Sequence, residues 1–77
     1  MYPCFTVIEC VPSQPEITQT TFGIAMLKNG QLLDELPDLT ISRTDVELMV
    51  RRLNQNGVSA VHFREILYDW VTEQSMP

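Results

Sequence analysis

The pattern of residues 44–73 constrains the fold most, because it predicts two amphipathic helices with a glycine between them. The first helix is expected over residues 45–56 and the second over residues 60–73. Gly57 separates them and can adopt the positive φ that commonly ends a helix. Each helix carries apolar residues along one side only, so a further layer of structure must cover both of them.

The first helix has a start signal and an apolar stripe. Thr44 and Glu47 fit a capping box, in which the Thr44 hydroxyl accepts a hydrogen bond from the Glu47 amide. Glu47 also lies four residues before Arg51, a favourable spacing for an exposed ion pair. Four apolar residues recur at spacings of three and four and share one face: Val46, Met49, Val50 and Leu53.

The second helix has the same two features. Ser59 is placed to cap its N-terminus. Its apolar stripe is wide and consists of Phe63, Ile66, Leu67, Trp70 and Val71.

Three β-strands are expected before the helices, over residues 4–11, 18–28 and 31–35. β-Branched and aromatic residues dominate the first strand, and Pro12 follows it. The dipeptide Asn29-Gly30 separates the second strand from the third and is typical of a tight hairpin turn. Pro37 lacks a backbone donor, so an irregular edge segment is expected between the third strand and the first helix.

This order predicts a single two-layer α+β domain over residues 1–77, in which a three-stranded antiparallel β-meander packs against a C-terminal α-helical hairpin. The bulky face of the second strand, which carries Phe22, Ile24 and Met26, is expected to meet the helices. The small residues Gly23 and Ala25 lie on the other face. They would let a second copy of the chain pack closely, so a homodimer is a further expectation.

Charge narrows the class of partner. Ten acidic and five basic side chains give a formal net charge of −5. This balance disfavours nucleic acid and anionic membranes and favours a protein with a basic surface. No apolar stretch reaches the roughly 20 residues that span a bilayer, and the N-terminus lacks the pattern of a secretory signal. The expected location is therefore the cytoplasm.

The candidate partner-binding residues lie on the second helix. Glu65, Asp69 and Glu73 follow one another at spacings of four and form a line of negative charge, with His62 at its N-terminal end. These four residues form the acidic strip. The sequence predicts that the strip binds a basic partner.

A second acidic cluster consists of Asp34, Glu35 and Asp38, near the third strand. Carboxylates suit a hard cation such as calcium, but their spacing here matches no coordination loop. No catalytic, metal or cofactor site is therefore predicted.

A thiol-dependent enzyme is one alternative, since His62 could serve as the base for Cys4 or Cys10. Their even spacing on one strand puts the two cysteines on the same face about 20 Å apart, which is too far for a disulfide. Both cysteines are expected instead to be buried or half-buried apolar residues.

A helix-turn-helix DNA-binding protein that uses residues 45–73 is the second alternative. Apolar residues follow the turn where such a motif needs them. However, Leu53 occupies a position that should be small, and Arg64 is the only cation on the would-be reading helix. Repulsion between that helix and phosphate makes protein binding the preferred hypothesis.

Four short segments carry a family resemblance: Phe22-Gly23-Ile24, Pro37-Asp38-Leu39-Thr40, Leu53-Asn54 and Ile66-Leu67-Tyr68-Asp69-Trp70. Together they resemble a family of short, uncharacterised Firmicutes proteins, a domain of unknown function with the order strand, strand, strand, helix, helix. Leu39-Thr40 stands where the family usually has Ile-Ser. The resemblance implies a compact α+β fold and a bacterial cytoplasmic origin, and it brings no activity, cofactor or catalytic residue. The functional hypothesis is a small non-enzymatic protein-interaction or regulatory module.

Overall fold

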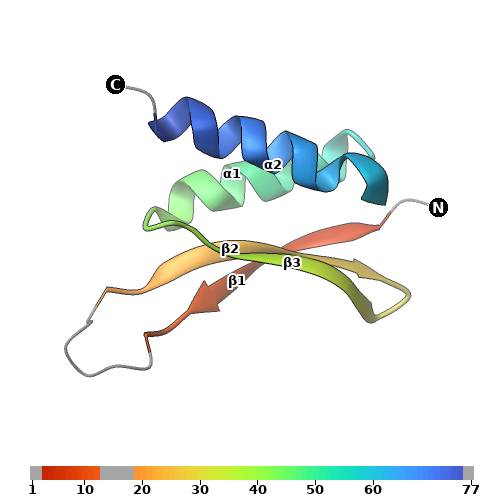
Figure 1. The fold of residues 1–77 in the computed structure, drawn as a ribbon. Helices are drawn as coiled ribbons and strands as arrows, with labels where there is room; N and C mark the ends of the chain where they lie inside the picture. The colour runs from red at the N-terminus through yellow and green to blue at the C-terminus, as the bar shows by residue number, and fades with distance from the viewer. Residues whose placement is uncertain (1–2, 13–18, 76–77) are drawn as a thin grey trace.

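The computed structural model describes residues 3–12 and 19–75. Five elements follow one another along the chain (Figure 1): β1 (Cys4–Cys10), β2 (Thr21–Lys28), β3 (Gln31–Thr40), α1 (Arg43–Gln55) and α2 (Ala60–Ser75). The strands form one antiparallel sheet in the order β1-β2-β3. Both helices lie on the same side of this sheet in Figure 1. The predicted two-layer α+β fold is confirmed.

The core lies between the sheet and the helical hairpin. Ile24 pairs with Val7 on one side and with Leu36 on the other, and its side chain is fully buried. Side chains from all five elements form the buried core: Phe5, Ile24, Met26, Leu36, Val46, Met49, Leu53, Phe63 and Leu67. Phe22 packs against this cluster. The prediction that the bulky face of β2 meets both helical stripes is therefore confirmed.

The first helix starts earlier than predicted, and its cap is a different residue. Ser42 is the N-cap, and its side-chain oxygen accepts a hydrogen bond from the Asp45 amide at 3.3 Å. The Thr40 hydroxyl accepts from the Ser42 amide and so closes the short connection from β3. Glu47, the predicted partner of Thr44, accepts instead from Arg43 at 2.9 Å. The strand preceding the helix ends close to Ser42, so Ser42 becomes the residue with extended backbone that can cap.

The third strand also differs from the prediction, because it continues to Thr40 rather than ending at residue 35. Pro37 is tolerated because β3 is an edge strand, where a missing amide donor leaves no neighbouring strand without a partner. Asp38 has a φ of 56°, and the register with β2 shifts between Phe22 and Ile24. The irregular segment expected from Pro37 is thus a bulge inside the strand.

The other strand ends differ little from prediction. The first strand ends at Cys10, one residue before its predicted end, and the second begins at Thr21. Residue 18, the predicted start of the second strand, lies outside the described residues. The second helix begins at Ala60, as predicted, and extends to Ser75. The largest of these differences is three residues, at the start of β2, and element ends are the least certain part of a prediction from sequence.

Gly23 has an intramolecular role that the sequence did not reveal. A Cβ at this position would collide with the Leu36 carbonyl oxygen and lie 2.7 Å from the Pro37 Cα. The bulged part of β3 therefore needs a glycine beside it. Ala25, the other small residue on this face, is only 4 % exposed within the single chain. The small size of Gly23 and Ala25 motivated the homodimer prediction, and packing within one chain is sufficient to explain it.

One side chain covers the outer edge of β1. Asn54 of α1 accepts from the Phe5 amide at 2.9 Å and donates its own amide to the Phe5 carbonyl at 3.0 Å. The backbone groups of Phe5 therefore point away from β2. Asn54 occupies the place where a further strand would pair with this residue.

The outer edge of β3 is covered in a similar way. The Glu35 amide donates to the Asp34 carboxylate at 2.9 Å. Arg64 of α2 donates two further hydrogen bonds to the same carboxylate, at 2.7 and 2.8 Å. The β1 edge is thus occupied near the start of the strand and the β3 edge near its middle, which disfavours pairing of another chain at these positions.

Candidate functional site

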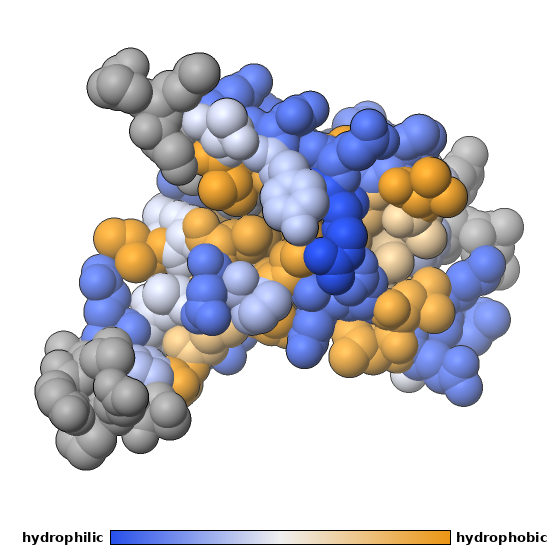
Figure 2. Space-filling model, viewed as in Figure 1, coloured by the Kyte–Doolittle hydropathy of each residue, from blue (hydrophilic) through white to orange (hydrophobic). Residues whose placement is uncertain are grey.

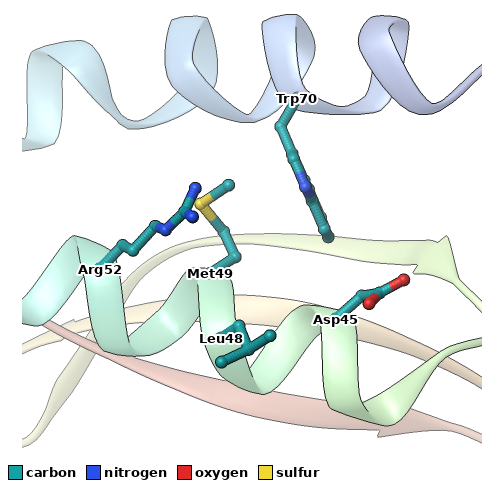
Figure 3. A pocket seen from close by; sticks show the side chains of 5 residues that line it. All are labelled: Asp45, Leu48, Met49, Arg52 and Trp70. Atoms are coloured by element: carbon teal, nitrogen blue, oxygen red, sulfur yellow. The ribbon is translucent and has the colours of Figure 1, made fainter.

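A groove between the two helices is lined by residues that face each other across the hairpin. Figure 3 shows the Trp70 indole pointing from α2 toward α1, while Met49 and Arg52 project from α1 toward α2. Asp45 lies at the Trp70 end of this hollow. The hollow has a volume of about 120 Å³, and Leu48 also lines it. Apolar side chains and two charged ones share its lining, since Asp45 supplies a carboxylate and Arg52 a guanidinium.

The polypeptide forms this hollow for a local reason. Met49 lies in the buried stripe of α1 and is 7 % exposed, whereas Leu48 lies one position off the stripe and is 51 % exposed. Trp70 is half-buried and packs against the core cluster. A large ring on one helix and an off-stripe leucine on the other therefore leave apolar surface open between them.

A second hollow, of about 410 Å³, lies at the turn between the helices. Gly57 has a φ of 59°, and the Val58 amide donates back to the Leu53 carbonyl at 3.4 Å. This geometry ends α1, as the sequence predicted for Gly57. From α2, His62 and Ile66 complete the lining of the hollow.

The acidic strip is exposed along its whole length. His62, Glu65, Asp69 and Glu73 are all solvent-exposed on α2. The His62 Nδ1 lies 3.3 Å from a carboxylate oxygen of Glu65, so the structure brings these two side chains together. Ile66 and Trp70 follow His62 at spacings of four, so His62 shares their side of α2, next to Asp69 and Glu73. The strip therefore borders the groove on the α2 side.

The arginine of α2 does not offset the charge of the acidic strip, because it is paired with a residue of the sheet. Arg64 binds the Asp34 carboxylate of β3 with two hydrogen bonds. These hydrogen bonds hold the pKa of Asp34 below its ordinary value; partial burial opposes the shift, and the Glu35 amide adds to it. The same contact raises the pKa of Arg64. Arg64 therefore neutralises the sheet edge rather than the acidic strip.

The second acidic cluster does not gather into a cation site. Asp34 is paired with Arg64, and Asp38 accepts a hydrogen bond from the Thr21 hydroxyl. Glu35 lies exposed on the opposite side of the strand. Within residues 3–12 and 19–75, no three histidine, cysteine or acidic side chains lie close enough to hold a metal ion.

The structure separates the residues of the thiol-enzyme alternative. Phe5 and Met26 are paired and face the helices, so Cys4 and Cys10 point to the open side of the sheet. His62 lies on α2, on the other side. Cys4 is exposed, contrary to the expected burial, whereas Cys10 is half-buried as expected; both are free thiols. Cys4 sits at the end of β1, where no helix covers it.

The helix arrangement bears on the DNA-binding alternative. In Figure 1, α1 and α2 run in opposite directions side by side, whereas the helices of a helix-turn-helix motif cross at roughly 90–120°. The one cation of the would-be reading helix, Arg64, is bound to Asp34. Both observations disfavour DNA binding.

Among the described helices, none is long and apolar enough to cross a membrane.

Sequence reasoning found the strip but missed the groove. The i, i+4 spacing of acidic residues was sufficient to predict the strip. The signal for the groove was Leu48, an apolar residue one position outside the buried stripe of its helix. Nothing in the sequence predicted that Asn54 would bind the backbone of Phe5.

Comparison with known proteins gives a family without a described activity. A model of a family of unknown function, DUF6514, matches residues 4–73. No curated protein and no solved structure matches the chain.

Proposed function

The chain belongs to DUF6514, a family of unknown function, and from its surface we propose that it is a small non-enzymatic protein-interaction or regulatory module of a bacterial cytoplasm. The acidic strip carries this proposal. It presents three carboxylates and a histidine on one exposed side of α2, and the nearest cation on that helix is bound to the sheet. A partner with a basic surface matches this charge.

The position of the strip supports protein binding over solvation alone. The strip runs beside half-buried apolar residues, including Ile66 and Trp70. Protein interfaces combine an apolar centre with a charged rim, and aromatic residues are enriched at the centre. The strip and the groove together have this composition.

A pull-down from lysate of the source organism, read by mass spectrometry, tests the proposal. The bait carries Asp69→Lys and Glu73→Lys, and the matched control carries Glu9→Lys and Glu35→Lys. Each double variant replaces two acidic residues with lysine, so both change the net charge equally. All four residues are exposed, so neither variant disturbs the core. We expect a partner retained by the native chain and by the control to be lost with the strip variant.

Equal capture by both variants would contradict the choice of surface. Equal loss from both would show that overall charge, rather than the strip, governs retention. Repeating the capture at higher salt sharpens the result, because an interaction at exposed charges weakens as ionic strength rises.

A further inference from the structure

Two hollows lie along the seam of the helical hairpin: the groove at Trp70 and the hollow at the turn. On α1, Asp45, Met49, Arg52 and Asn56 line them at spacings of four, three and four, so these residues share one side of the helix. The helices run antiparallel (Figure 1), and each hollow is lined by residues of both the α1 side and the α2 side of the seam. From residue 45 to residue 56 these lining residues extend over roughly 16 Å of helix, about three turns.

Apolar side chains stand among the polar residues that line the two hollows. Leu48 is 51 % exposed, and Trp70, Ile66 and Val58 are each half-buried. Single exposed apolar side chains are ordinary on a protein surface. Here Leu48 and Trp70 line the first hollow and Val58 and Ile66 the second, so an amphipathic partner lying along the seam could contact all four.

The charges around the groove select the partner. Asp45 lies among the lining residues, and Asp69 and Glu73 of the strip border the α2 side. Arg52 is the cation among the residues that line the two hollows. The charged residues in and beside the two hollows therefore carry net negative charge and match a partner with basic flanks.

The state of the sheet edges indicates whether the partner binds as an extended strand or as a helix. An extended peptide usually binds by adding a strand to an open edge. In this protein Asn54 occupies the β1 edge at Phe5, and Asp34 occupies the β3 edge at Glu35, so a further strand is hindered at these two positions. An amphipathic helix instead binds by laying its apolar side into a groove between helices, with its axis 8–10 Å away by the ordinary packing distance.

We propose that the groove between α1 and α2 binds an amphipathic helix of another protein that carries lysine or arginine on its flanks. This inference rests on the proposed function and names its partner class. The helix would lie along the hairpin seam as a third helix, with its apolar side on Leu48 and Trp70 and its cations beside Asp69 and Glu73.

Trp70 is the single tryptophan of the chain and lies in the groove, so its fluorescence reports occupancy directly. The probe is a synthetic 14-residue helical peptide with leucine at every third and fourth position and lysine on both flanks. A second peptide carries glutamate in place of every lysine. We expect a saturable shift of Trp70 emission with the lysine peptide and a much weaker response to the glutamate peptide.

Two leucines of similar exposure give the matched protein variants. Leu48→Ser removes the apolar wall of the groove and is expected to weaken binding of the lysine peptide about tenfold. Leu33→Ser alters a leucine of β3 that is 48 % exposed, and it should leave binding unchanged. The Asp69→Lys and Glu73→Lys variant should also weaken binding.

Four outcomes would overturn the proposal. The first is no saturable shift up to about 1 mM peptide, which corresponds to only about 4 kcal/mol of binding free energy. The second is equal binding of the glutamate peptide. The third is loss of binding on reversing the strip while Leu48→Ser has no effect, which leaves the proposed function standing without the groove. The fourth is a shift of Trp70 emission with protein concentration alone, which identifies a second copy as the occupant.

Discussion

The two faces of the sheet are built from the same three strands but meet different surroundings. On the helix-covered face, Ile24 has no exposed surface and Phe63 of α2 is equally buried against it and its neighbours. On the open face, Leu32 pairs with Leu27 and remains 55 % exposed. Figure 2 shows exposed apolar surface where the β2–β3 hairpin ends. Apolar composition alone therefore does not decide which face is buried; the stripes of the two helices decide it.

The largest difference between the faces is expected from Phe63→Ala. The Phe63 ring is fully buried and its centroid lies 5.2 Å from that of Phe5. Truncation should lower the free energy of unfolding by about 3–5 kcal/mol, because it leaves a cavity in the core. Urea denaturation measures this change. Leu32→Ser on the open face should change stability by no more than about 0.5 kcal/mol, and comparable losses from both would contradict the assignment of the faces.

Gly23 also lies on the open face, but here even a small substitution, Gly23→Ala, is expected to destabilise the protein. Its added methyl group would meet the backbone of Leu36 and Pro37, which cannot move as a side-chain end can. We expect a loss of about 1–3 kcal/mol, the usual cost of overpacking. Thermal unfolding followed by circular dichroism measures it. A neutral result would show that the β3 bulge shifts easily and does not depend on the glycine.

Asn54→Ala tests how the helical layer holds the edge of the sheet. Both backbone groups of Phe5 would lose their partner in a partly buried place, at a cost of about 1–3 kcal/mol. Hydrogen exchange of the Phe5 amide should accelerate at the same time. The variant should also self-associate more at high concentration, since it frees the β1 edge; sedimentation measures this, and an unchanged monomer fraction would argue against the protective role.

The smallest effect is expected at Asp34, which is bound to the exposed Arg64. The folded-state pKa of Asp34 is lowered, so the pair stabilises the protein above the ordinary carboxylate pKa of about 3.9, and this contribution disappears as pH falls through the lower folded value. Asp34→Asn keeps an acceptor for the Glu35 amide and removes the charge. Its destabilisation should be present at pH 7 and shrink below about pH 4. A difference from the native chain that is constant between pH 7 and pH 3 would contradict the ion pair.

The candidate site was only half predictable from the sequence. Spacing along one helix is a local property, so the acidic strip of His62, Glu65, Asp69 and Glu73 could be identified directly. The groove depends on how α2 is rotated relative to α1, and this rotation is set by the packing of Phe63 and Leu67 in the core.

The sequence by itself determined the five elements, their order and the buried sides of the helices. These follow from hydrophobic periodicity, from the Asn29-Gly30 turn and from Gly57, all of which act over a few neighbouring residues. Only the tertiary structure decided the partners of Asn54 and Arg64, because Asn54 binds a residue 49 positions away and Arg64 one 30 positions away. The length of β3, its bulge over Gly23 and the choice of Ser42 as cap likewise depend on the neighbouring strand and on the docked helix. Contacts between distant segments have no local signature, so folding alone brings these residues together.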